Sequence, residues 1–219
     1  KKNRGENHPG FHTTIDPVVI ASRIVLALQT ITSRELSPLE PSVITVGSIH
    51  GGSKHNVISD EVKLQLTLRS YNPEVRLQQI AAIKRISQGI ALSAGLDESL
   101  APEVFVHEDE SIPSTYNNPA QTNLVRSAIA NAIGEDNVLE TEAVMAGEDF
   151  GLYGRTEQHV PITLFWLGGV EPSQYDEAMK SGATLPSLHS SKFAPDYKKA
   201  LPTGITAMSN AAVALFNKK

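Results

Sequence analysis

A strict alternation of apolar and polar side chains over residues 62–69 most constrains what this chain can fold into. Val62, Leu64, Leu66 and Leu68 alternate with Lys63, Gln65, Thr67 and Arg69. Because successive side chains of a strand point to opposite faces, this segment predicts a strand with one buried face and one exposed face. Residues 42–49 are rich in β-branched side chains and lead into Gly51 and Gly52, which predicts a second strand.

Helical patterns flank the two predicted strands. Asp16 and Pro17 stand before apolar residues at helical spacing from Ile20 to Ile31, and a second such pattern runs from Pro73 to Ile90. We expect a further strand around residues 104–106, and a first strand near residues 1–6 that is missing or frayed. The order of elements predicts an antiparallel sheet covered by two helices, an α+β sandwich over residues 1–110.

The pattern changes near residues 108–119, where acidic residues, prolines and asparagines replace the regular spacing. We place a domain boundary there and assign residues 111–219 to a second domain. Helices are expected over residues 124–133 and 197–217. The continuous apolar run at residues 161–167 predicts a strand buried on both faces, with Phe165 and Trp166 in the core.

Composition excludes several classes of function. The chain has 219 residues, a net charge of −5 and no cysteine, and it lacks an apolar run long enough to span a membrane. Basic residues are scattered, so no nucleic-acid or membrane partner is expected, and the cytoplasm is the default compartment. Without thiolates, a metal could be held only by His, Asp or Glu.

Five motifs, in this order, resemble the metal-dependent amidohydrolase and peptidase family that includes hippurate hydrolase, indoleacetyl-amino-acid hydrolase, aminoacylase and carboxypeptidase G. They are His12-Thr13-Thr14-Ile15-Asp16-Pro17, Gly51-Gly52 followed by Asn56-Val57-Ile58-Ser59-Asp60, Leu68-Arg69, Met145-Ala146-Gly147-Glu148-Asp149-Phe150 and Leu188-His189-Ser190. The resemblance implies a lid or dimerisation domain at residues 1–110. Residues 111–219 would be the C-terminal portion of an α/β catalytic domain.

The resemblance implies roles for three residues. His189 would bind a divalent metal, zinc or manganese, whose other ligands this sequence does not contain. Arg69 would bind the carboxylate of the substrate through its planar guanidinium. Asn56 would reach into the active site of a partner subunit in a homodimer. The alternatives are an ordinary loop histidine for His189, a solvated strand charge for Arg69 and a turn residue for Asn56.

The resemblance also implicates three further residues. Gly147 would let the backbone approach the substrate, and Glu148 would line the catalytic cleft, unless it only starts a helix. His8 lies one residue after the position that corresponds to a catalytic histidine of the family's lid, where this chain has Asn7. A local shift would let His8 serve in its place.

The sequence therefore predicts part of a metal-dependent amidohydrolase that cleaves a small N-acyl amino acid or amide by metal-activated water. The Glu general base and most metal ligands are not in this sequence, so the isolated chain is expected to be inactive. Two alternatives stay open. One is a non-catalytic dimerising fragment or regulatory homologue, and the other is an unrelated α+β binding domain.

Overall fold

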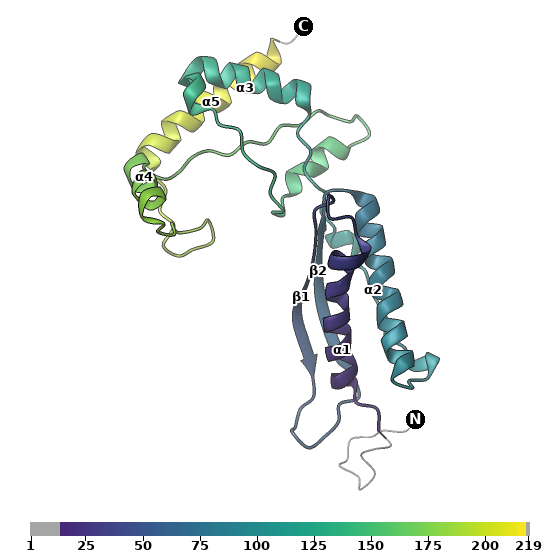
Figure 1. The fold of residues 1–219 in the computed structure, drawn as a ribbon. Coiled ribbons are helices and arrows are strands. Elements are labelled where there is room, and N and C mark those ends of the chain that lie inside the picture. The colour runs from purple at the N-terminus through teal and green to yellow at the C-terminus, as the bar shows by residue number, and fades with distance from the viewer. Residues whose placement is uncertain (1–13, 218–219) are drawn as a thin grey trace. The chain divides into compact units, whose positions relative to one another are not determined.

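The computed structural model describes residues 14–217, which form two compact units (Figure 1). Unit 1 contains the described residues up to Ser114 together with Met145–Gly147. Unit 2 contains Thr115–Val144 and the described residues from Glu148 onward. No helix within residues 14–217 is long and apolar enough to cross a membrane.

Two long helices of unit 1 begin as their sequences predict. Helix α1 spans Pro17–Thr30, and the Asp16 carboxylate accepts a hydrogen bond from the backbone of Val18 at 2.8 Å. Helix α2 spans Pro73–Ser93 and is capped in the same way by Asn72. Each cap satisfies an N–H group that has no partner within its helix. A short π-helical segment, η2 at Ile31–Glu35, continues α1.

The two predicted strands of unit 1 form an antiparallel pair. Strand β1 spans Ser42–Gly51 and strand β2 spans Val62–Ser70, and they are the two strands of the sheet in the described part of the chain. A bulge between Val46 and Ser48 shifts the register. Side chains of β2 alternate between half-buried and exposed along its whole length, as the sequence predicted.

The core of unit 1 lies between the sheet and the two helices, which run side by side along it (Figure 1). Leu28 and Ile31 are completely buried in this core. Apolar residues of all four elements contribute to it: Ile20, Ile24, Ile44 and Val75 are buried, and Leu64, Leu66 and Leu68 pack against them. One layer of helices on one face of an antiparallel sheet is the α+β arrangement that the sequence indicated.

The further strand expected around residues 104–106 is wrong, because residues 101–107 have no strand pairing. Val104 still packs against the core of unit 1. Its segment is anchored to α2 by an ion pair of 2.8 Å between Arg76 and Glu108. An apolar side chain can therefore fill the core from a segment that does not join the sheet. The strand expected near residues 1–6 lies outside the described residues.

Unit 2 is built around two helices that pack on each other. Helix α3 spans Pro119–Ile133 and α5 spans Tyr197–Phe216, and their core contains Val125, Ile129, Ala207 and Ala211. A third helix, α4 at Pro172–Ser181, was not predicted from the sequence. Short 3-10 segments complete the described chain: Glu98–Leu100 and Glu108–Glu110 in unit 1, and Glu135–Asn137 and Asp149–Arg155 in unit 2.

The apolar run at residues 161–167 is not a strand, which corrects the sequence prediction. Side chains and backbone near the start of α3 satisfy its backbone groups instead. The Asn117 amide donates to the Leu164 carbonyl at 2.8 Å and accepts from the Leu164 N–H at 2.7 Å, and the Asn118 N–H donates to the Ile162 carbonyl. A strand needs a neighbouring strand, whereas this segment is held by side chains and backbone of the α3 region, which also include the Gln121 amide on the Pro161 carbonyl at 2.8 Å and a hydroxyl contact between Thr122 and Thr163.

Packing around this run follows the prediction in part. Phe165 packs against the core of unit 2, whereas Trp166 is 58% exposed, so placing Trp166 in the core was wrong. A methyl group at Gly204 of α5 would come within 2.7 Å of Leu167. Glycine at position 204 therefore lets the extended run lie close against the helix.

Candidate substrate-binding site

Arg69 lies near the end of β2, on the face of the sheet that the helices leave uncovered. Its neighbours Leu68 and Ser70 point toward the helices, and Arg69 itself is exposed. This orientation follows from the alternation of a strand, in which adjacent side chains leave opposite faces. The guanidinium is therefore accessible to a ligand.

The guanidinium of Arg69 donates a hydrogen bond to the backbone carbonyl of Met145. Met145–Gly147 belongs to unit 1, although the residues on both sides of it belong to unit 2. Two of the predicted substrate-binding positions, Arg69 and Gly147, thus lie in one region of unit 1. A methyl group at Gly147 would meet no atom within 4 Å, so open space adjoins this backbone.

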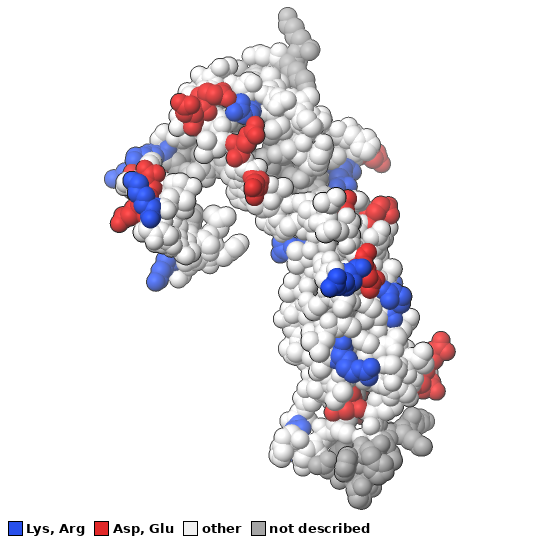
Figure 2. Space-filling view, in the orientation of Figure 1, with Lys and Arg blue, Asp and Glu red and all other residues white. Residues whose placement is uncertain are grey.

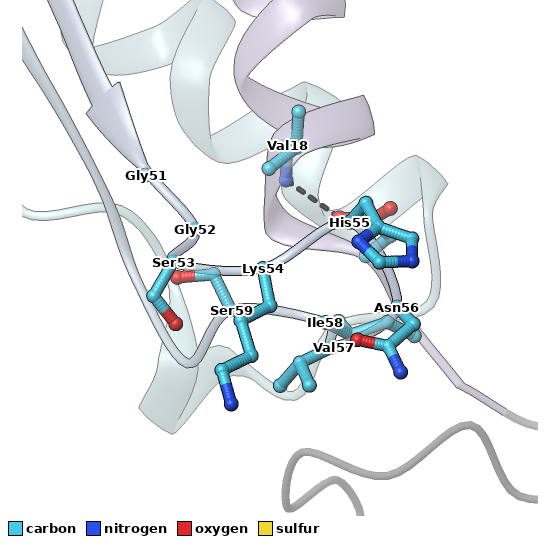
Figure 3. Close-up of a pocket in the computed structure, with 11 residues that line it drawn as sticks. Val18, Gly51, Gly52, Ser53, Lys54, His55, Asn56, Val57, Ile58 and Ser59 are labelled. Atoms are coloured by element: carbon cyan, nitrogen blue, oxygen red, sulfur yellow. Dashed lines mark hydrogen bonds between the residues drawn. The ribbon is translucent and has the colours of Figure 1, made fainter.

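Asn56 occupies the loop that joins β1 to β2. The loop residues Gly51–Ser59, together with Asp16 and Val18 at the start of α1, line an open hollow of about 440 Å³ (Figure 3). The side chains of Lys54 and Asn56 project on the side of the loop away from Val18 (Figure 3). Asn56 is exposed in this hairpin loop.

Asn56 and Arg69 lie at opposite ends of the sheet. The strand pairing runs from Gly51 and Val62 at the loop end to Ser42 and Ser70 at the other end, where Arg69 pairs with Val43. With a rise of about 3.3 Å per residue, the seven steps from Val62 to Arg69 cover roughly 23 Å. One small substrate therefore cannot contact both Asn56 and Arg69 of the same chain.

Glu148 caps the 3-10 segment Asp149–Arg155. Its carboxylate accepts a hydrogen bond from the backbone N–H of Phe150 at 3.0 Å. Phe150 packs against Tyr153, with ring centroids 5.6 Å apart. Glu148 therefore does start a helical segment, as the alternative interpretation of the sequence expected. Its side chain is nevertheless exposed, directly after Gly147.

His189 is exposed on a turn that is closed by a hydrogen bond of 2.9 Å from the Ser190 N–H to the Ser187 carbonyl. Within residues 14–217, no three His, Asp or Glu side chains gather in a way that could hold a metal ion. Zinc in proteins takes three or four protein ligands. The described residues therefore do not fit a complete metal centre, and His189 can be at most one ligand. His8, the remaining predicted residue, lies outside the described residues.

Acidic and basic residues are interspersed on the visible surface of both units (Figure 2). The largest pKa shift among the described residues is in unit 2, where the Ser173 hydroxyl and then the Lys199 ammonium lower the pKa of Glu171 to about 2. This group caps α4 and lies apart in sequence from every predicted site residue. Its shifted pKa reflects the capping hydrogen bonds of a helix terminus.

Sequence reasoning missed one polar residue next to Arg69. Gln79 of α2 is fully buried, and its side-chain nitrogen lies 3.3 Å from the Val43 carbonyl oxygen and 3.4 Å from that of Arg69. Its position could have been found from the spacing, because Gln79 lies four residues from both Val75 and Ile83 on the buried face of the helix.

Residues 4–93 match the model of the peptidase dimerisation domain of the M20 family. The chain is 34% identical to thermostable carboxypeptidase 1 of Saccharolobus solfataricus, over 98% of this chain and 50% of that protein. It is 33% identical to N-acetyldiaminopimelate deacetylase of Enterococcus faecalis, over 99% of this chain and 51% of that protein. The chain thus spans about half the length of these curated relatives.

Solved structures support the fold. A dinuclear metal-binding M20 peptidase of Bacillus subtilis matches with a TM-score of 0.68 and 22% identity, over 94% of this chain and 47% of that one. A putative aminohydrolase of Staphylococcus aureus matches with a TM-score of 0.66 and 23% identity, over 99% of this chain and 50% of that one. The predicted fold class, a two-helix antiparallel lid followed by part of a metallopeptidase-like domain, is confirmed. The chain is therefore a relative of the amidohydrolases and peptidases of the M20 family, and residues 4–93 correspond to the dimerisation domain of that family.

Proposed function

We propose that this chain is the lid and the C-terminal catalytic portion of a metal-dependent amidohydrolase that acts on small N-acyl amino acids or related amides. The position of Arg69 carries the proposal. Its exposed guanidinium lies beside Met145–Gly147, the segment directly before Glu148. A planar guanidinium with open space beside it suits bidentate recognition of a substrate carboxylate.

Gly147 contributes to the same proposed site through its backbone. Because no atom lies within 4 Å of the place where its side chain would begin, a ligand held by Arg69 can approach the peptide groups there. Glu148 of unit 2 is proposed separately as a residue of the catalytic cleft, and its carboxylate holds the turn that places Phe150. The groups that activate water are not assigned to described residues of this chain.

His189 is proposed as one ligand of a divalent metal, zinc or manganese. An imidazole suits either metal, and an exposed turn leaves it free to join ligands supplied from elsewhere. The described residues do not complete that site, so we expect the isolated chain not to turn over substrate. His8 is proposed to serve, after a local shift, in place of the catalytic histidine of the family's lid.

The separation of Asn56 from Arg69 supports a homodimer. Because the two residues lie at opposite ends of one sheet, Asn56 can serve a substrate held by Arg69 only if it belongs to a second subunit. The match of residues 4–93 to a dimerisation domain supports the same assembly. Light scattering at tens of micromolar, where weak association still registers, should give the mass of a dimer. A monomer would refute this part of the proposal.

The decisive test is Arg69→Met in the complete enzyme. Loss of a charge-assisted hydrogen bond costs about 1.5–3 kcal/mol, so KM for an N-acyl amino acid should rise roughly 10- to 100-fold. The matched control is Lys63→Met, on the same exposed face at the other end of β2, where Lys63 pairs only loosely with Glu61. An unchanged KM in Arg69→Met would show that Arg69 is only a solvated charge on the strand and does not bind substrate.

A further inference from the structure

Gln79 is the polar side chain most deeply buried in the described part of unit 1, and it lies under the strand end that carries Arg69. Its exposed fraction is 0%, because it lies on the same buried face of α2 as Val75 and Ile83. The side-chain nitrogen contacts the carbonyl oxygens of Val43 and Arg69, at 3.3 and 3.4 Å. These two residues are partners across the sheet, so one amide group bridges both strands.

A glutamine at this position has an energetic cost beside its two contacts. The side-chain oxygen of Gln79 is buried and has no hydrogen-bond partner among the described residues. An unpaired buried acceptor is destabilising, whereas an apolar residue of similar length would fit among the apolar neighbours without that cost. A buried polar group that breaks the local pattern indicates a functional constraint.

The ladder continues for one residue pair beyond Val43 and Arg69. The next pair, Ser42 and Ser70, is the last of the ladder and brings no apolar side chain. Terminal pairs of a two-stranded ladder open readily. Beyond the Ser42–Ser70 pair, the Ser114 hydroxyl donates to the Tyr71 carbonyl at 3.0 Å. Gln79 thus provides a contact from the helix layer to the backbone of Arg69 itself.

We infer that Gln79 is a positioning residue for Arg69: its amide fixes the backbone of β2 so that the Arg69 guanidinium leaves the opposite face of the sheet in one direction. The inference rests on the proposed role of Arg69 in substrate binding. A ligand held by one planar guanidinium is sensitive to small shifts of its anchor, because the hydrogen bonds depend on geometry. Gln79 acts without touching the substrate.

Hydrogen exchange on the 219-residue chain tests the positioning without any activity. In Gln79→Met, the amides of Val43 and Arg69 should exchange about fivefold faster relative to that of Leu66, the factor expected for about one lost hydrogen bond. The control is Ser87→Ala, which changes the other buried polar residue of α2, two turns away, and should leave this ratio unchanged. An unchanged ratio in Gln79→Met would overturn the inference.

The unaltered protein provides a measurement that does not depend on a variant folding. Because the Gln79 amide is buried against two carbonyls, its side-chain NH₂ protons should exchange much more slowly than those of the exposed neighbour Gln78. Equal rates would show that the bridge does not persist and would overturn the inference.

Kinetics of the complete enzyme separate this inference from the proposed function. Gln79→Met should raise KM for an N-acyl amino acid about fivefold with little change in kcat, because a substrate carboxylate is bound in both ground and transition states. If Arg69→Met raises KM and Gln79→Met does not, the positioning role is wrong and the proposed function stands. If neither variant changes KM, the proposed role of Arg69 fails.

Discussion

The two units differ in how their apolar residues find partners. In unit 1, helices α1 and α2 and the sheet share one core whose members come from every element. In unit 2, the core is a seam between α3 and α5 in which two of the four buried residues are alanines. Large side chains of α5 such as Leu201, Ile205 and Met208 are more than half exposed. The two units have similar lengths, but the apolar side chains of unit 1 are buried far more completely than those of unit 2.

The difference shows what an amphipathic pattern specifies. Leu201, Ile205 and Met208 recur at helical spacing, yet the buried face of α5 is the one with Ala207 and Ala211. A pattern predicts that a face is apolar, and the available neighbours decide whether it is covered. In unit 1 the apolar faces and their partners lie within the described residues, whereas in unit 2 the face of α5 with Leu201, Ile205 and Met208 stays more than half exposed among the described residues.

The largest expected effect is the difference in unfolding free energy between two leucine-to-alanine substitutions, one in each unit. Leu28→Ala in α1 removes a completely buried side chain and should lower the free energy of unfolding of unit 1 by about 2–5 kcal/mol. Leu201→Ala in α5 removes one that is 58% exposed and should change the stability of unit 2 by no more than about 0.5 kcal/mol. Urea unfolding of the 219-residue chain measures both. Comparable losses would show that the exposed face of α5 is covered in solution.

The next effect concerns the extended run of unit 2. Asn117→Ala removes the side chain that pairs with both backbone groups of Leu164, and leaving those groups unpaired should cost about 1–3 kcal/mol. The control is Asn137→Ala, which removes a single exposed hydrogen bond to the Ile133 carbonyl and should cost less. The measurement is urea unfolding of unit 2 with exchange of the Leu164 amide. An unaltered Leu164 amide in Asn117→Ala would contradict this account.

Much of unit 1 could be predicted because its signals are local. The Asp16 and Asn72 caps, the alternation of β2 and the helical spacing of α1 each specify an element from neighbouring residues. The run at residues 161–167 could not be predicted in the same way. Its composition suits a buried strand, but strand formation depends on a neighbouring strand, and Asn117 takes that place instead.

The candidate site shows the same division. The exposed direction of Arg69 follows from strand alternation, and the exposure of Asn56 follows from its place in a hairpin loop. The contact of Arg69 with Met145 joins residues far apart in sequence, so no local pattern contains it. The bridge made by Gln79 was overlooked because a polar residue on a helix is ordinarily assigned to the exposed face.

The smallest expected effect is on the ion pair that links the start of α4 to the start of α5. The pKa of Glu171 is lowered to about 2, mainly by the Ser173 hydroxyl and then by Lys199, and the pKa of Lys199 is raised by Glu171. The stabilisation from Glu171 is present above its ordinary pKa of 4.5 and is lost as the pH falls toward 2. That from Lys199 is present below 10.5 and is lost as the pH rises above it.

Acid should therefore loosen α4 before it loosens α1, whose anchor is an apolar core. Carbon-detected NMR titration of the Glu171 carboxyl checks the cause: Ser173→Ala should raise the pKa of Glu171 more than Lys199→Met does, because the hydroxyl makes the larger contribution. The exposed pair should contribute little to overall stability, since solvent screens it. If Lys199→Met had the larger effect, the pair would be held by charge rather than by the capping hydrogen bond. Unit 2 would then depend on salt in a way that the core of unit 1 does not.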